Sequence, residues 1–236
     1  MSLIRHAPRE RGRLARIPPH DLKPVHGDIA SHPVAGFPGK SEFQRHQTCL
    51  TLIWNESDST VMLRLMLLRH AKSSWSSPGT QDAARPLTGR GEVAARLMGG
   101  YMARHSLVPE RVLCSSARRT RETWAAIAAQ WPADMDVVFD QRLYAATSQV
   151  VLSVVRAQDN AARTLLVIGH NPGLQEAAEL LIAAGDVELR ERLREKFPTA
   201  ALAVIDFTID KWSSIHERSG RLDRYITPRS IAAATN

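Results

Sequence analysis

Residues 63–70 read LRLMLLRH, a short apolar run that ends in two basic side chains. An apolar run of this length predicts a strand buried on both faces, as in a parallel sheet. From this run to about residue 207, strand-like and helix-like segments alternate along the chain. That order is typical of a mostly parallel sheet covered by helices on both faces. We therefore expect an α/β fold: a three-layer α/β/α sandwich with a largely parallel central sheet.

The remaining elements follow from the same patterns. Further strands are expected at 112–114, 137–139, 164–168 and 200–207, with an edge strand at 222–227. Helices are expected from residue 89, after 115–116, from 148, after 171 and over 188–196. In the first of these helices, the spacing of Val93, Leu97 and Tyr101 predicts the buried face. At the start of the fourth, Asn171 is expected as the N-cap and Pro172 as the first helical residue.

Residues 1–60 differ in composition from the rest of the chain. They are rich in Pro, Gly and Arg and hold five of the nine histidines. We predict a flexible N-terminal extension here, followed by one domain over residues 61–236. Two alternatives remain open: sequence lying upstream of a later start at Met62 or Met66, or a histidine-rich arm that binds a metal or a partner. The irregular histidine spacing, without a paired cysteine, does not match a zinc site.

Charge and composition narrow the possible partners. The formal net charge of +7 favours anionic partners. The basic residues are spread along the chain without a basic block or interleaved aromatics, so we do not expect nucleic-acid binding. No stretch has the roughly 18–20 apolar residues of a membrane span. With no secretory signal and only two cysteines, Cys49 and Cys114, we expect a cytoplasmic protein.

Three polar clusters follow predicted strands, at 69–70, 115–120 and 169–173. Ligands of such sheets bind beyond the carboxyl ends of the strands, so the three clusters should share one edge. Together they supply two histidines and at least two arginines. Burying four such groups side by side would cost several kcal/mol without a counter-ion. The arrangement therefore indicates a site for an anion.

With these motifs in place, the chain resembles a known family. Residues 68–71 (LRHA) look like the signature of the histidine phosphatase superfamily, which includes the phosphoglycerate mutases. Residues 69–75, 82–88, 169–173 and 196–203 are similar to its SixA-like phosphohistidine phosphatase branch. The resemblance covers about Met62 to Arg229 and leaves out residues 1–60. It implies a phosphoglycerate mutase-like fold and a hydrolase that removes phosphate.

The resemblance also implies roles for individual residues. His70 would be the nucleophile and would form a phosphohistidine intermediate. Arg69, Arg119 and His170 would hold the phosphoryl oxygens and stabilise the transferring charge. No metal and no other cofactor is expected, because these groups provide the positive charge. Arg119 is preferred to Arg118 because aligning residues 115 and 123 with the ends of the family's second motif places Arg119 at the arginine position.

The general acid is the less defined part of this site. Asp82 occupies the position that has been given this role in the SixA-like branch. The alternative is a loop carboxylate paired with Arg85, and Glu92 and Glu122 remain as other candidates. The residues expected to contact substrate directly are Arg85, Asn171 and Ser115.

Three functions remain open from the sequence. The leading prediction is a metal-independent phosphatase acting on phosphohistidine in a protein, since a leaving imidazole demands less of a general acid than an alkoxide. The alternatives are a phosphomonoesterase acting on a small metabolite and a non-catalytic phosphate-binding module. The expected partner is accordingly a phosphorylated protein or a small phosphorylated compound. Nothing in the sequence specifies the oligomeric state.

Overall fold

The computed structural model describes residues 63–75, 79–131 and 135–235. The predicted flexible extension over 1–60 lies outside the described residues, and the domain boundary stays a prediction. Among the residues that are described, no helix is both long enough and apolar enough to cross a membrane.

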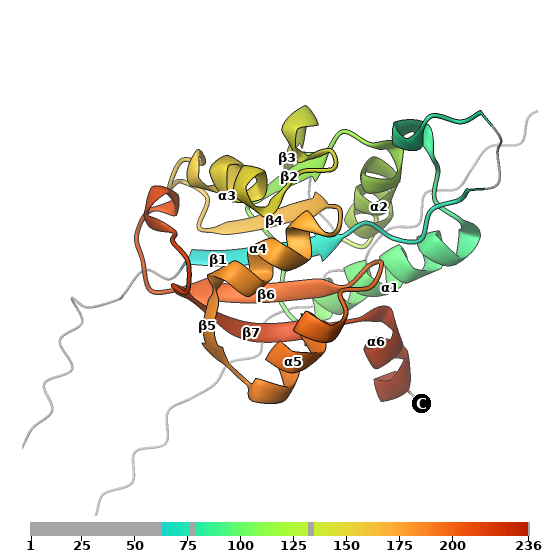
Figure 1. Ribbon diagram of the computed structural model, residues 1–236. Coiled ribbons are helices and arrows are strands. Elements are labelled where there is room, and N and C mark those ends of the chain that lie inside the picture. The colour runs from blue at the N-terminus through green and yellow to red at the C-terminus, as the bar shows by residue number, and fades with distance from the viewer. Residues whose placement is uncertain (1–62, 76–78, 132–134, 236) are drawn as a thin grey trace, which may run out of the picture. The chain divides into compact units, whose positions relative to one another are not determined.

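The domain is built on one sheet of seven strands in the order β3-β2-β4-β1-β6-β7-β5 (Figure 1). Neighbouring strands pair in parallel except where β6 is involved, because β6 runs antiparallel to both β1 and β7. Six strands thus share one direction, which confirms a largely parallel sheet. The strands are β1 (Leu63–Arg69), β2 (Arg111–Ser115), β3 (Asp136–Asp140), β4 (Thr164–Gly169), β5 (Ile182–Gly185), β6 (Leu202–Phe207) and β7 (Gly220–Ile226).

Helices cover both faces of the sheet. Along β1, Leu65 and Leu67 pack into a core formed with α3, α4 and α5, whereas Met66 and Leu68 pack into a second core with α1, α2 and α6. Side chains of a strand alternate between the two faces of its sheet, so one apolar strand serves both cores. The three-layer prediction is confirmed. The helices are α1 (Gly89–Arg104), α2 (Arg118–Ala128), α3 (Ser148–Arg156), α4 (Gly173–Leu181), α5 (Val187–Glu195) and α6 (Pro228–Thr235), with 3₁₀ turns η1 (Asp82–Ala84), η2 (Gln141–Leu143) and η3 (Trp212–Ser214).

The buried face of α1 differs from the prediction. Val93 is 58% exposed, and Leu97 is only half-buried. The face that packs inward instead carries Gly91, Ala95, Met98, Gly99 and Met102. A Cβ on Gly91 would lie 2.1 Å from the carbonyl oxygen of Lys72. The helix therefore approaches the backbone through its glycines, and an apolar period does not record such a contact.

The C-terminal third of the chain contains two further differences. The strand predicted at the edge, β7, lies between β6 and β5, and the short β5 that the sequence pattern missed forms the edge. The predicted cap of α4 was also wrong. The helix begins at Gly173 without a side-chain cap, and the amide of Asn171 donates to Gln175 Oε1 and to the carbonyl of Phe197, each at 3.1 Å.

Candidate active site

The register of the sheet brings His70 and His170 together. Strands β1 and β4 are parallel neighbours in which Arg69 is level with Gly169, so the two histidines are the next residue on each strand. The backbone N–H of His70 donates to the carbonyl of Gly169 at 3.0 Å, and the imidazole centroids lie 5.2 Å apart. The helices that follow these strands, α1 and α4, cover opposite faces of the sheet (Figure 1). Such a point in an α/β sheet is where ligands bind.

The imidazole of His70 has one nitrogen committed and one free. Its Nδ1 lies 2.7 Å from the carbonyl oxygen of Ala71, which can only accept, so Nδ1 carries the proton. The lone pair is therefore on Nε2. Burial lowers the pKa of His70 to about 4; the bond to Ala71 opposes this shift, and the charges of Arg119, Arg69 and Arg85 add to it. At neutral pH the ring is uncharged and able to attack an electrophile.

His170 is neutral as well, but both of its nitrogens are occupied. Nη2 of Arg119 lies 3.2 Å from its Nδ1, and a guanidinium can only donate. The ring proton is then on Nε2, which donates to Ser115 Oγ at 2.8 Å. Burial, followed by the charges of Arg119 and His70, lowers the pKa of His170 to about 3. The fixed positive charge of this site therefore comes from its arginines.

Arg119 faces the histidines and Arg118 faces solvent. Arg119 is 6% exposed, and its Nη1 and Nη2 donate to the backbone carbonyl and to Oδ2 of Asp82 at 2.7 and 3.0 Å. Arg118 is exposed and pairs with Glu122 at 2.6 Å along α2. Two adjacent arginines at the start of one helix thus point in different directions, and Arg119 is the one that reaches His170.

Arg69 carries a buried donor without an acceptor. Its Nη1 donates to the carbonyl of Phe197 at 2.8 Å, the same carbonyl that accepts from Asn171. Its Nε is buried and makes no hydrogen bond to the residues that the structure describes. Burial lowers the pKa of this guanidinium. An unsatisfied buried donor costs about 1–3 kcal/mol, which an incoming oxyanion would offset.

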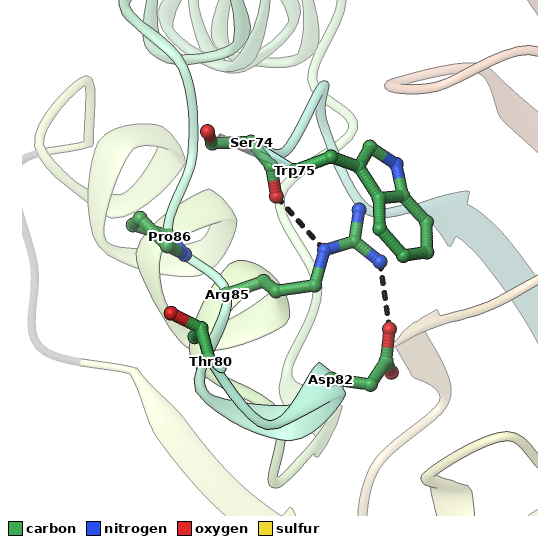
Figure 2. Close-up of a pocket in the computed structure, with 6 residues that line it drawn as sticks. All are labelled: Ser74, Trp75, Thr80, Asp82, Arg85 and Pro86. Carbon is green, nitrogen blue, oxygen red and sulfur yellow. Dashed lines mark hydrogen bonds and ion pairs between the residues drawn. The ribbon is translucent and has the colours of Figure 1, made fainter. Parts of the chain in front are cut away.

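Arg85 organises the loop between β1 and α1. Its Nε donates to the carbonyl of Ser74 at 2.8 Å, and its Nη1 donates to Asp82 Oδ1 at 2.6 Å (Figure 2). Its Nη2 donates to Ser73 Oγ at 2.9 Å, and the indole of Trp75 stacks on the guanidinium, 3.2 Å from ring centroid to Cζ. These contacts face a small cavity of about 90 Å³. Arg85 is thus bound to the loop rather than directed at the histidines.

Asp82 is an ionised carboxylate at the centre of this network. Its Oδ2 accepts from the hydroxyl of Tyr144 at 2.8 Å and from Arg119, while Oδ1 accepts from Arg85. The Tyr144 hydroxyl, then Arg85 and Arg119, hold the pKa of Asp82 well below its usual range. The loop carboxylate paired with Arg85, which the sequence left open, is present in the structure. It also positions Arg119.

Tyr144 is the site residue that the sequence reasoning missed. It follows η2, after β3, and its ring is nearly perpendicular to the imidazole of His170 with centroids 5.7 Å apart. Arg119 Cζ lies 5.9 Å from the same ring, and the bond to Asp82 raises the pKa of the phenol. The available signal was its place beyond a parallel strand of the same sheet, at the edge where the other clusters lie.

The remaining candidate residues lie around this arrangement. Ser115 is fully buried, and its hydroxyl contacts His170. Thr123 accepts from the backbone N–H of Ala71 at 3.0 Å and donates to the carbonyl of Arg119 at 2.6 Å. Glu122 accepts from the backbone of Leu87 and pairs with Arg118, and Glu92 is an exposed partner of Arg96. The structure therefore brings His70, His170, Arg69, Arg119 and Asp82 together, with Arg85, Asn171 and Ser115 bonded around them.

Comparisons with known proteins agree with this architecture. A family model described as the histidine phosphatase superfamily (branch 1) matches residues 65–145. An uncharacterised protein of Mycobacterium tuberculosis (strain ATCC 25618 / H37Rv) is 34% identical over 164 residues, which are 69% of this chain and 100% of that protein.

Two solved structures extend the similarity to three dimensions. A putative phosphohistidine phosphatase SixA from Agrobacterium tumefaciens is 30% identical with a TM-score of 0.60, covering 70% of this chain and 98% of that one. A putative phosphohistidine phosphatase SixA from Nakamurella multipartitia is 27% identical with a TM-score of 0.62, covering 71% of this chain and 96% of that one.

Proposed function

The chain belongs to the histidine phosphatase superfamily, and we propose that it hydrolyses phosphohistidine in proteins with His70 as its nucleophile. The observation that carries the proposal is the bond from His70 Nδ1 to the carbonyl of Ala71, which leaves a neutral ring with a free Nε2. Phosphohistidine in the names of the two SixA structures supports the substrate class.

The reaction has two transfers. In the first, Nε2 of His70 attacks phosphorus, a P–N bond to His70 forms, and the bond from phosphorus to the substrate nitrogen breaks. The leaving imidazole takes up a proton from solvent. In the second, water attacks the phosphorylated His70, giving inorganic phosphate and restoring the neutral imidazole.

Arg69 and Arg119 supply the charge that both transfers need. Each is held by a backbone carbonyl, of Phe197 and of Asp82 respectively, so each guanidinium is oriented before substrate arrives. Preorganised donors of this kind stabilise the charge that develops on the phosphoryl oxygens. His170 is neutral and its Nδ1 accepts from Arg119, so we assign it the orientation of that guanidinium.

The state of Asp82 favours a phosphoramidate over an ester. A carboxylate bonded to Tyr144, Arg85 and Arg119 is ionised at neutral pH and has no proton to donate. An alkoxide leaving group needs such a proton, whereas imidazole leaves readily and is protonated by water. We therefore assign Asp82 a positioning role and not that of the general acid.

A substrate panel tests the proposal. We expect kcat/KM for a protein carrying phosphohistidine to exceed that for sugar and nucleotide phosphates by at least about 100-fold, a difference of roughly 3 kcal/mol in transition-state stabilisation. An ester hydrolysed faster than the phosphoramidate would instead identify a small-molecule phosphomonoesterase.

Trapping the intermediate tests the nucleophile separately. Quenching wild type during turnover with alkaline detergent should leave protein-bound phosphate, and subsequent acid treatment of the denatured protein should release it. His70→Asn, which keeps the size and polarity of the ring, should give neither bound phosphate nor turnover. Bound phosphate in that variant at the wild-type level would show that another residue is the nucleophile.

A further inference from the structure

A basic cleft of about 760 Å³ adjoins the nucleophile. It begins at Arg69, the neighbour of His70, and lies among the start of α1, the end of α5, the end of β7 and the start of α6. In Figure 1, α5 and α6 flank the end of β7. The cationic residues of its lining are Arg69, Lys72, Arg90, Arg192, Lys196 and Arg229.

These cations have no counter-ion within the described part of the chain. The five cations other than Arg69 are exposed. Their side chains form no hydrogen bond or ion pair with the residues that the structure describes. The lining contains a single acidic residue, Glu195, against six cations. Elsewhere, arginines such as Arg64 and Arg111 each pair with two carboxylates. The cleft therefore keeps a strong local excess of positive charge.

Two of the cations stand where helix electrostatics disfavours them. Arg90 is the second residue of α1, and Arg229 is the second residue of α6. The first turn of a helix carries partial positive charge and favours acidic side chains, so a cation there is destabilising. Helix stability thus gives no reason for arginine at either position, whereas an anion in the cleft would.

We propose that this cleft binds acidic side chains that surround the phosphorylated histidine of a protein substrate. The inference rests on the proposed function and specifies which phosphoproteins it favours. Because Arg69 belongs both to the cleft and to the phosphoryl site, one substrate can occupy the two together. Exposed cations spread over several elements match carboxylates spread over a protein surface, and they steer association through long-range charge. A compact second phosphate would instead need a few converging, largely buried donors.

Two peptides of equal length provide the test. Each carries one histidine phosphorylated with phosphoramidate. The flanking residues are Asp and Glu in one peptide and Asn and Gln in the other. We expect wild-type kcat/KM to be on the order of tenfold higher for the acidic peptide at low ionic strength. The preference should shrink as salt rises towards 0.5 M, because exposed charges are then screened.

A triple variant assigns the preference to the cleft. Combining Arg90→Gln, Arg192→Gln and Arg229→Gln should bring the ratio of the two kcat/KM values close to one and leave kcat/KM for the neutral peptide within about twofold of wild type. The matched control combines Arg104→Gln, Arg194→Gln and Arg221→Gln. These three arginines are exposed and lie outside the cleft lining. The control removes the same charge and should keep the preference.

The outcomes separate this inference from the proposed function. Equal wild-type rates on the two peptides, or a preference lost equally in both triple variants, overturn the cleft assignment and leave phosphohistidine hydrolysis standing. Turnover of neither peptide, with p-nitrophenyl phosphate still hydrolysed, overturns both. A third outcome would identify a small metabolite, and not an acidic protein, as the ligand of the cleft. In that outcome the two peptides are hydrolysed at equal rates, wild type prefers a small bisphosphate to a monophosphate, and only the cleft variant loses this preference.

Discussion

At the scale of single residues, the bonds of Asp82 lead to a prediction about its role. Asp82→Asn removes the charge that holds Arg119, Arg85 and Tyr144. We expect kcat/KM to fall about 10–100-fold, because a misplaced guanidinium no longer meets the phosphoryl group. The loss should be the same for p-nitrophenyl phosphate and for phenyl phosphate, which differ in leaving-group basicity.

The same comparison would identify a general acid. If Asp82 were the general acid, the loss of kcat/KM in Asp82→Asn would be far larger for phenyl phosphate, because its leaving group needs the proton more. Tyr144→Phe serves as the milder variant, since it removes one bond to Asp82 and leaves both ion pairs. Its kcat/KM should fall by less than about tenfold on both esters.

The residues predicted from the sequence and the one that was missed differ in a physical way. His70, His170 and Arg119 belong to short motifs directly after strands, so their convergence follows from the parallel order of the strands. Tyr144 stands alone after a 3₁₀ turn, and only the path of that turn directs its hydroxyl to Asp82. The ionised state of Asp82 likewise depends on contacts between segments more than 30 residues apart, which no local pattern contains.

At the scale of elements, the close approach of α1 to the loop after β1 gives a stability prediction. Gly91→Ala would place a Cβ 2.1 Å from the carbonyl oxygen of Lys72, so helix or loop must move. We expect the free energy of unfolding to fall by about 2 kcal/mol or more, measured by urea denaturation.

Gly89→Ala is the matched control for that variant. It lies two residues earlier in α1, and a Cβ there meets nothing within 4 Å. Alanine is the better helix former, so stability should be unchanged or up to about 1 kcal/mol higher. Equal losses in the two variants would show that glycine flexibility at the helix start matters, and not the contact with Lys72.

The elements also show why part of the fold could not be predicted. The apolar pattern predicted β1 and β4, because large side chains make the contacts of those two strands. It placed Val93 inward and missed Gly91 and Gly99, because a contact made through glycine has no apolar side chain to detect. The apolar pattern did not indicate the direction of β6, because a strand buried on both faces has the same pattern in parallel and in antiparallel pairing.

At the scale of the whole molecule, the two neutral histidines make stability depend on pH. Their pKa values lie at about 4 for His70 and about 3 for His170 in the folded protein, against 6.5 in the unfolded chain. As pH falls below 6.5, the unfolded chain binds protons that the folded protein does not, so stability falls. Between pH 7 and pH 5 we expect a loss of about 2 kcal/mol for each histidine.

Urea denaturation of wild type and of the two histidine variants at pH 7 and pH 5 checks this pH dependence. His70→Asn and His170→Asn should each reduce the difference in unfolding free energy between pH 7 and pH 5 by about 2 kcal/mol. Asp82 does not contribute in this window, because its lowered pKa affects stability only below about pH 4. A pH dependence that is unchanged in both variants would mean that the histidines are protonated in the folded state.

The position of β1 in the sheet has a consequence for synthesis on the ribosome. The strand that ends at Arg69, just before His70, is the first strand in the described part of the chain, yet its two partners are β4 and β6, which begin at Thr164 and Leu202. Both edges of this strand are unpaired until β4 is translated about 100 residues later, and one edge stays unpaired until β6 is translated about 140 residues after β1 begins. Unpaired strand edges invite aggregation. The nascent chain thus carries the proposed nucleophile His70 long before β1 is paired on both sides, so we expect phosphoryl binding to begin only after nearly all of the described domain has emerged.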